Sequence, residues 1–459
     1  MRSSTKMTFI GLNFALMFLV SSSFAQKSPS HFKSEIDFGG GTVISTFLDL
    51  AIARDQFTIT SPKNADVRMV GRVKAKLGRR LGKLPKKGII ITIKGVQKND
   101  SLFGDTKIPM FGKLKFRGIV KNETLSGELL NEKGTAIGTV QGVNSNEDKI
   151  HYKELTPKIL ATIRDNIYSP EVLQTKEWKS FEKKIEKLGN EAHDDIELFF
   201  GFSILAQKLP FTHLYLLIAQ DSEDDNKETP STHQSVIFEE RNSTTAYLQI
   251  KDFSSSQEEL AAILPKIVEN TAFKNLIIDL RNNGGGGVGP AFELAKYIVT
   301  EDMEVGYFPT NKLSYSGYRP ELFKTLPELQ PKSTNELGQE LKTTPGVKLI
   351  FKKPVNPVFT GNIYVLTNDM TGSTCEPMVY ALKKSKRATI IGEKTHGAML
   401  AASPFVVSGK YMLMLPVADF YTYDGVRLDK VGVKPDIEVK PEDAETKALE
   451  IINGGKNKK

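Results

Sequence analysis

The stretch NIYVLTNDMTGSTCEPMVYALKKSK, residues 362–386, decides the fold of the carboxyl-terminal half of the chain. It begins with a continuous apolar run, which is typical of a strand covered on both faces, and ends with a helical pattern. The runs NLIIDL (275–280) and ATIIGEK (388–394) predict two more strands of this kind, and Pro290 starts another helical pattern after the first of them. Strand–helix–strand repetition predicts an α/β core.

Ser373 lies between the expected strand and the expected helix of this stretch. Open α/β sheets gather their sites at the carboxyl ends of strands. The free N–H groups at a helix amino terminus stabilise a developing oxyanion, and the N–H of Thr374 is the obvious donor. A serine at such a turn is more often a helix cap than a nucleophile, so its position alone does not assign its role.

A second loop, DLRNNGGGGVG at 279–289, also joins an expected strand to an expected helix. Its four successive glycines leave backbone N–H groups uncovered, which suits a phosphate or an oxyanion. The loop lacks the Gly-Lys-Ser/Thr ending of a phosphate loop and the G-x-G-x-x-G spacing of a dinucleotide site. It therefore matches neither standard nucleotide-binding pattern.

The first 25 residues have the layout of a secretory signal peptide: two basic residues, an apolar run over residues 7–20, and small residues ending at Ala25. The apolar run is short for a transmembrane helix, although an anchoring helix is the alternative. We therefore expect export with cleavage near Ala25, giving a periplasmic or extracellular protein without an integral membrane span.

The rest of the chain divides into three parts. Residues 26–150 are rich in short strand-like runs, glycines and polar turns, which predicts a small antiparallel barrel or sandwich. Residues 151–207 carry apolar residues at helical spacing, which predicts two or three helices. Residues 208–459 hold the α/β core, interrupted at 305–358 by a long connection of the kind that forms lids and substrate-facing insertions.

Composition narrows the classes of protein to which this chain could belong. Hydrophobic residues make up 39% of the chain and charged residues 25%, as in ordinary folded proteins. A single cysteine, Cys375, excludes an intramolecular disulfide. The net charge is +8 and its densest basic run, residues 74–87, has no interleaved aromatic residues. We therefore expect a solvated face or attraction to anionic surfaces there, and no nucleic-acid partner.

Four segments in order, LIIDLRNNGGG, IYVLTNDMTGSTCEPMVYALK, ATIIGEKTHG and GVRLDKVGVKPDIEV, resemble the C-terminal processing and tricorn-core serine peptidases. The resemblance covers roughly residues 195–440. It implies a serine-type peptidase with a peptide or protein substrate, no metal, no organic cofactor, and a catalytic core of crotonase-like or ClpP-like αββ units. It leaves the oligomeric state open.

The resemblance also implies site residues. In the family, the nucleophile lies three residues before a glutamate; Glu376 sets this register, so Ser373 matches the nucleophile. The oxyanion hole then combines the N–H of Thr374 with that of Gly284 or Gly285.

Two branches of the family differ in the residue that acts as the general base. One branch uses a lysine after GE-x-T-x-G, but here GEKTHG is followed by Ala398. The tricorn-like branch uses a histidine at the end of the helical segment, where this sequence has Thr212 and His213. Imidazole suits a general base because its pKa lies near neutrality. Thr212 stands where that branch has a serine, and Asp429, just before GVKPD, stands where it has an orienting glutamate.

Other candidates receive structural roles. We interpret His193 as a helix-start cap rather than part of a metal cluster, His396 as pocket wall, and Cys375 as a packing residue rather than a catalytic thiol. Residues 214–245 are too few and too polar for the peptide-binding PDZ domain that many members insert there. Substrate selection is therefore expected from the 305–358 stretch, the amino-terminal β domain, or both.

The sequence thus predicts an exported serine peptidase. Ser373 attacks a carbonyl, His213 is its base, and Thr212 and Asp429 orient the imidazole. Two alternatives stay open. A non-catalytic ligand- or peptide-binding protein on the same scaffold is favoured by the departures at Thr212 and Asp429, and an esterase would use the same residues.

Overall fold

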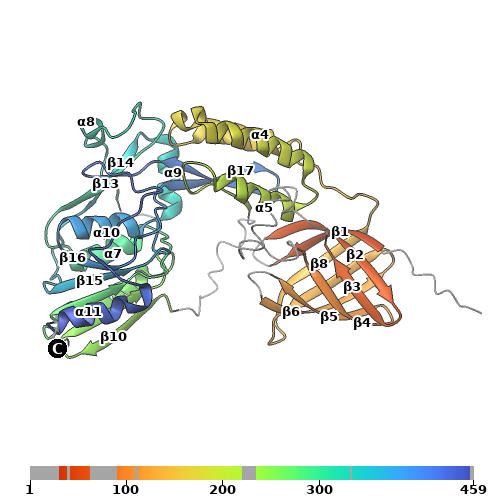
Figure 1. Cartoon of the computed structure of the whole chain (residues 1–459), viewed down its shortest axis with the longest axis horizontal. Coiled ribbons are helices and arrows are strands. Elements are labelled where there is room, and N and C mark those ends of the chain that lie inside the picture. The colour runs from red at the N-terminus through yellow and green to blue at the C-terminus, as the bar shows by residue number, and fades with distance from the viewer. Residues whose placement is uncertain are drawn as a thin grey trace, which may run out of the picture.

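The computed structural model describes residues 30–38, 42–61, 90–108, 112–219, 234–330 and 333–454. The expected signal peptide and the basic run at 74–87 lie outside these residues. Figure 1 shows a barrel, a group of helices above it, and an α/β core that holds the carboxyl terminus. Across the described ranges, no helix is long and apolar enough to cross a membrane.

The amino-terminal part is a closed barrel of eight antiparallel strands in sequence order. Strand β1 pairs with both β2 and β8, which closes the sheet. Inward-facing residues alternate with exposed ones, as at Leu114 and Phe116 of β6, and their apolar side chains fill the interior. The strands are β1 (Ser30–Asp37), β2 (Val43–Ala53), β3 (Gln56–Thr60), β4 (Thr92–Lys98), β5 (Ser101–Ile108), β6 (Gly112–Lys121), β7 (Thr124–Leu130) and β8 (Ala136–Asn144).

The helical part follows the barrel. In its longest helix, Trp178, Phe181, Ile185 and Leu188 recur every three or four residues and form one buried face. This face belongs to an apolar cluster that also contains Leu413 of the core, so the helices pack on the core. The elements are α3 (Leu155–Asn166), the 3₁₀ helix η1 (Pro170–Gln174), α4 (Lys176–Glu191) and α5 (Asp195–Ala206).

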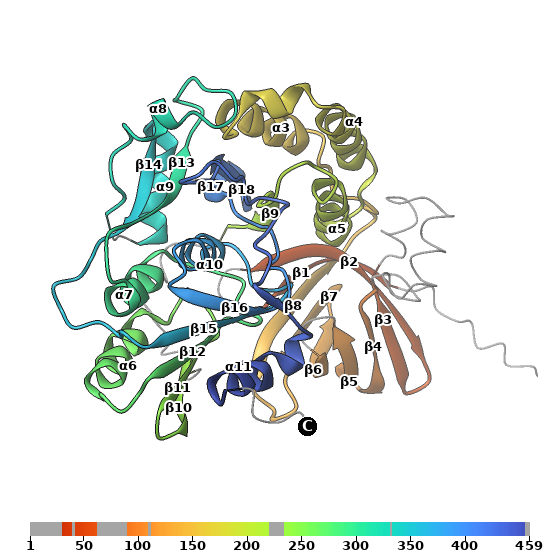
Figure 2. The same ribbon diagram turned by 60° about the vertical axis from the view of Figure 1, so that its left-hand side comes forward.

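The core is built on a six-stranded sheet of order β10-β11-β12-β15-β16-β20, parallel except for the β10–β11 pair. Leu276 and Ile278 face helices α6, α7 and α10, whereas Ile277 faces α11 on the other side (Figure 2). Both faces are covered, which explains the continuous apolar strands. The elements are β10 (Val236–Asn242), β11 (Thr245–Ile250), α6 (Gln257–Glu269), β12 (Asn275–Asp279), α7 (Gly289–Ile298), β15 (Asn362–Thr367), α10 (Cys375–Lys384), β16 (Ala388–Gly392), β20 (Ile437–Glu438), the 3₁₀ helix η3 (Pro441–Asp443) and α11 (Ala444–Ile452).

Two three-stranded sheets flank this core, with orders β14-β13-β19 and β17-β18-β9. Their elements are β9 (Tyr215–Ile218), β13 (Met303–Pro309), α8 (Pro320–Phe323), α9 (Thr334–Thr343), β14 (Gly346–Phe351), β17 (Ala401–Ser408), β18 (Tyr411–Ala418) and β19 (Tyr421–Thr422). The expectation of a long connection at 305–358 was therefore wrong in part, because β13 and β14 pair with each other inside it. The finer expectation of crotonase-like αββ units stays a prediction.

A buried carboxylate joins the barrel, the helices and the core. Asp195, at the start of α5, accepts hydrogen bonds from the Ser45 N–H of β2 (2.8 Å) and the Tyr411 hydroxyl of β18 (2.6 Å). It also pairs with Lys410 at 2.6 Å. These contacts attach the barrel to the β17–β18 hairpin.

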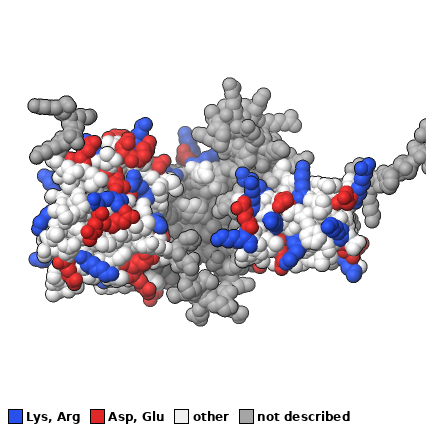
Figure 3. All heavy atoms as spheres, turned by 90° about the horizontal axis from the view of Figure 1, so that it is seen from below, with Lys and Arg blue, Asp and Glu red and all other residues white. Residues whose placement is uncertain are grey.

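Seen from below (Figure 3), basic and acidic side chains are interspersed over both the core and the barrel.

Candidate active site

Ser373 lies in the turn between β15 and α10, half-buried and with φ +53°. This left-handed conformation is unfavourable for a residue with a side chain, and persists only where the surroundings hold it. Its N–H donates to Oε2 of Glu376 at 3.1 Å. The first turn of α10 therefore helps to hold Ser373 in this conformation.

Glu376 is the residue that holds this turn. It is fully buried, and besides Ser373 it accepts hydrogen bonds from the Thr395 hydroxyl (2.6 Å), the Gly397 N–H (2.7 Å) and the Ala398 N–H (2.8 Å). Burial raises the pKa of its carboxyl, and these four donors oppose that shift. The glutamate that marks the register of the sequence motif thus also joins the serine turn to residues 395–398.

The expected base lies in the segment between α5 and β9. His213 has φ +63°, and its Nδ1 lies 2.7 Å from Oγ1 of Thr212. The Thr212 hydroxyl donates to Oδ1 of Asp429, and its N–H donates to Oδ2 at 3.3 Å. The Thr212 hydroxyl has a single hydrogen, which it donates to Asp429. The hydrogen of the Thr212–His213 hydrogen bond must therefore be carried by Nδ1 of His213, with Oγ1 as its acceptor. Nε2 is then unprotonated, as a general base requires.

The environment of His213 keeps its ring neutral. Burial, with a smaller contribution from the like charge of His396, lowers its pKa from 6.5 to about 4. The unfolded chain takes up this proton near pH 6.5 and the folded one only near pH 4. The folded state therefore loses stability at this residue as the pH falls through that window.

This lowered pKa predicts the acid limb of activity. We expect the rate at which Ser373 reacts with an electrophile to stay nearly constant from neutral pH down to about pH 5, and to fall by half near pH 4, where His213 becomes protonated. The rate of labelling by a fluorophosphonate, followed against pH, measures it. An acid limb at pH 6.5 or above would show that the base is not a histidine in this environment.

Ser373 and His213 line one pocket of about 330 Å³, together with Thr374 and Gly286. Within the described part of the chain the Ser373 hydroxyl has no hydrogen-bond partner, so it is free to approach a substrate or Nε2; such contacts often tighten only when substrate binds. The rest of the wall is mainly apolar and consists of Tyr215, Leu217, Val288, Phe308, Leu337, Gly338, Met399, Leu400, Ala401, Ala402 and Met414.

The glycine loop packs directly on the serine turn. The Gly372 N–H donates to the carbonyl of Asn283 at 3.0 Å, and a Cβ added at Gly285 would lie 2.5 Å from that of Ser373. Only glycine fits this position, because Gly285 also has φ +99°. The two loops therefore form one continuous surface beside the nucleophile.

The expected oxyanion donors Gly284 and Gly285 stay a prediction, and the structure shows which N–H groups of the loop are already engaged. The Gly285 N–H already donates to Oδ1 of Asn283 at 2.9 Å, and Gly284 is not part of the pocket wall. Gly286 lines the pocket, and its carbonyl accepts from the Thr374 hydroxyl at 2.7 Å. Over the described residues, neither the Gly286 N–H nor the Thr374 N–H has a partner. Both groups belong to residues that line the same pocket as Ser373.

The remaining candidates lie elsewhere. Cys375 is buried with its Sγ against the carbonyl of Asn283, and burial raises the pKa of its thiol. His193 hydrogen-bonds Glu197 at the start of α5. His396 is exposed, and its Nδ1 lies 2.8 Å from the carbonyl of Asp369, outside the pocket wall. The described residues contain no group of three or more His, Cys, Asp or Glu side chains arranged to hold a metal ion.

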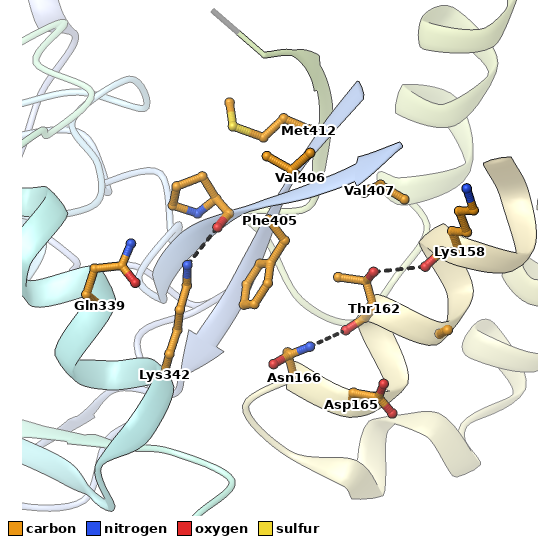
Figure 4. Close-up of a pocket in the computed structure, with 12 residues that line it drawn as sticks. Lys158, Thr162, Asp165, Asn166, Gln339, Lys342, Phe405, Val406, Val407 and Met412 are labelled. Carbon is orange, nitrogen blue, oxygen red and sulfur yellow. Dashed lines mark hydrogen bonds between the residues drawn. The ribbon is translucent and has the colours of Figure 1, made fainter. Parts of the chain in front are cut away.

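A second groove, of about 710 Å³, lies between α3, α9 and the edge strand β17 (Figure 4). The Lys342 ammonium crosses it, donating to the carbonyl of Pro404 at 2.8 Å and lying 4.4 Å from the centre of the Phe405 ring. Helix α9 contributes to both cavities: Leu337 lines the Ser373 pocket and Lys342 lines this groove. The helix from the 305–358 stretch thus forms part of the wall of the candidate active site.

Comparison with known proteins identifies this part of the chain. Residues 244–439 match the family model for peptidase family S41. The chain carries an S41 peptidase domain. It is 25% identical over 198 residues to the chloroplastic C-terminal processing peptidase of Tetradesmus obliquus, covering 43% of this chain and 35% of that protein. It is 25% identical over 225 residues to the carboxyl-terminal-processing protease of Synechocystis sp., covering 46% and 44%. Both alignments span less than half of the curated relative.

Solved structures are similar at lower identity. A putative peptidase from Parabacteroides merdae matches with a TM-score of 0.46 and 16% identity, over 66% of this chain and 96% of that one. The tricorn protease matches with a TM-score of 0.42 and 13% identity, over 88% and 46%. The S41 domain contains Ser373, the glycine loop and Asp429, whereas Thr212 and His213 precede it.

Proposed function

We propose that this protein is an exported serine-type endopeptidase with Ser373 as nucleophile and His213 as base. The observation that supports this most is the half-buried chain of hydrogen bonds from Asp429 through the Thr212 hydroxyl to Nδ1 of His213, which ends in the same pocket as Ser373. A histidine held in the Nδ1–H form, whose Nε2 has no hydrogen-bond partner among the described residues and which lines one pocket with a serine in a left-handed turn, is arranged for nucleophilic catalysis.

The proposed reaction has two halves. The Ser373 oxygen attacks the substrate carbonyl while Nε2 of His213 takes the hydroxyl proton, and the N–H groups of Thr374 and Gly286 bind the oxyanion. His213 then gives the proton to the leaving amine, which leaves an acyl-enzyme. Water, deprotonated by the same nitrogen, releases the acid and restores the serine. Asp429 and Thr212 stabilise the imidazolium in both halves.

The pocket suggests which substrates are accepted. Among the described residues that line it there is no Asp, Glu, Lys or Arg, and the His213 ring is neutral, so a charged substrate side chain would lose its hydration there without a partner. A volume of about 330 Å³ accommodates a bulky aliphatic or aromatic side chain. We propose that cleavage occurs beside such a residue.

Replacing His213 with alanine tests the catalytic assignment. We expect hydrolysis of a fluorogenic peptide with a bulky apolar side chain at the cleavage site to fall by about 10³-fold, since a general base contributes roughly 10²–10⁴. His151→Ala, at an exposed histidine outside the pocket, is the matched control and should leave the rate unchanged.

Paired substrates separate the alternatives. A peptidase hydrolyses both the amide and the matching ester, and an esterase only the ester. If the well-folded protein hydrolysed neither substrate, the interpretation as a non-catalytic binding protein would replace the peptidase assignment.

The proposal of export rests on residues 1–25 alone. Amino-terminal sequencing of the natural protein should find a start just after Ala25, and retention of Met1 would contradict export.

A further inference from the structure

A half-buried arginine lies behind the candidate catalytic residues. Arg427 donates through Nε to both carboxylate oxygens of Asp419, each at 2.9 Å, and through Nη2 to the Tyr168 hydroxyl at 2.9 Å. The same Nη2 lies 3.6 Å from Oδ2 of Asp429. Asp419 and Asp429 are 4% and 1% exposed. The Arg427 guanidinium therefore lies between two carboxylates that are almost entirely shielded from water.

The contacts to Asp429 divide between its two oxygens. Oδ1 accepts the Thr212 hydroxyl, and Oδ2 accepts the Thr212 N–H and faces Arg427. Thr212 therefore contacts both oxygens, but its N–H lies a long 3.3 Å from Oδ2. The guanidinium, itself held at two other points by Asp419 and Tyr168, is a second and positively charged contact of Oδ2, and it helps to fix where Oδ1 meets the hydroxyl.

We propose that Arg427, held by Asp419 and Tyr168, is a positioning residue that keeps the Asp429 carboxylate ionised and aligned with Thr212 and His213. This rests on the proposed function, because Arg427 acts through Asp429 and does not reach the pocket. Tyr168 follows α3, so the helical part contributes to the site as well as covering the core.

The charges around Asp429 support this role. Burial raises its pKa, while the Thr212 hydrogen bond and the positive charges of Arg427 and Lys430 lower it. The other titratable groups that interact electrostatically with Asp429 are Asp419, Tyr168 and Tyr215. Burial raises the pKa of Asp419 to about 6, and the charge of Arg427 opposes that shift. Without Arg427, Asp429 would take up a proton at higher pH and orient the imidazole less well.

The test compares Arg427→Gln with the wild-type protein in fluorophosphonate labelling of Ser373 across pH. We expect the labelling rate at neutral pH to fall about tenfold or more, and the acid limb to move up by about one pH unit, the shift that a nearby opposite charge typically produces. Arg427→Lys keeps the charge without the two-point geometry, so it should retain the acid limb of the wild-type protein and recover part of the rate.

Two controls separate this role from a merely structural one. Arg241→Gln removes an arginine that also pairs with two carboxylates, Glu239 and Glu445, and stacks on Tyr247 at 3.8 Å, but lies on β10 away from the pocket. It should leave both rate and acid limb unchanged. In an Asp429→Asn background, Arg427→Gln should cause little further loss, because its route of action is already removed.

The outcomes are distinct. The positioning role would be overturned by either of two results: Ser373 is labelled at the same rate in Arg427→Gln as in the wild-type protein, or Arg427→Gln causes the same loss whether or not Asp429 is present. Both results would leave the peptidase assignment intact. If the wild-type protein were not labelled at Ser373, the proposed function itself would fail.

Discussion

Ser373→Ala is expected to lower peptide hydrolysis by at least about 10⁴-fold, since removing the nucleophile of a serine peptidase leaves only binding and oxyanion stabilisation. The hydroxyl has no hydrogen-bond partner in the described part of the chain, so its loss removes no contact from the fold. The left-handed turn is held by the backbone of Ser373 through Glu376, and alanine keeps that hydrogen bond.

The comparison that makes this result specific is Ser385→Ala. Ser385 follows the other end of α10, and its hydroxyl donates to the Ala381 carbonyl at 2.8 Å. This variant loses a hydroxyl from the same helix without touching the pocket, so its activity should equal that of the wild-type protein. Hydrolysis that survived Ser373→Ala at the wild-type rate would remove Ser373 from the mechanism.

Glu376→Ala is expected to cause the largest loss of stability among these variants. It removes a fully buried side chain and leaves four donors without a partner: the Thr395 hydroxyl and the N–H groups of Ser373, Gly397 and Ala398. An unsatisfied buried donor costs about 1–3 kcal/mol, so the free energy of unfolding should fall by roughly 3 kcal/mol or more. Activity should fall too, because Glu376 joins the Ser373 N–H to residues 395–398, and the His396 N–H that donates to the Thr371 carbonyl holds the turn two residues away from the nucleophile.

Denaturant unfolding measures this loss, with Glu293→Ala as the matched control. Glu293 is also a buried glutamate, on α7, but within the described ranges its side chain pairs with the half-exposed Lys296 alone, at 2.6 Å. An ion pair of that kind contributes little, so this variant should lose much less stability. Equal losses in the two variants would show that the four hydrogen bonds of Glu376 contribute no more than ordinary burial.

The strands and helices of the core could be predicted because burial on both faces of a parallel sheet leaves continuous apolar runs, as at 275–280 and 362–369. The barrel could be predicted only as a barrel or a sandwich, because both alternate inward and outward residues along each strand. The strands at 303–309 and 346–351 were missed because the Pro-, Tyr- and Lys-rich sequence between and around them is typical of a connection.

For the site, the resemblance assigned Ser373, His213, Thr212 and Asp429, and the structure brings them together; their catalytic roles stay predictions. Spacing along the chain cannot show that the glycine facing the pocket is Gly286, because that depends on where the loop pairs with Phe253. It also gives no signal for Arg427, whose partners Asp419 and Tyr168 meet it only after folding. Long-range contacts of this kind are set by tertiary structure.

The most direct test of the central claim is mass spectrometry of the purified protein after incubation with a fluorophosphonate, beside His213→Ala. We predict a single adduct on the peptide that contains Ser373 and almost none in the variant, which would establish an activated serine whose base is His213. No adduct on the folded wild-type protein, or an adduct of equal yield in the variant, would contradict the account.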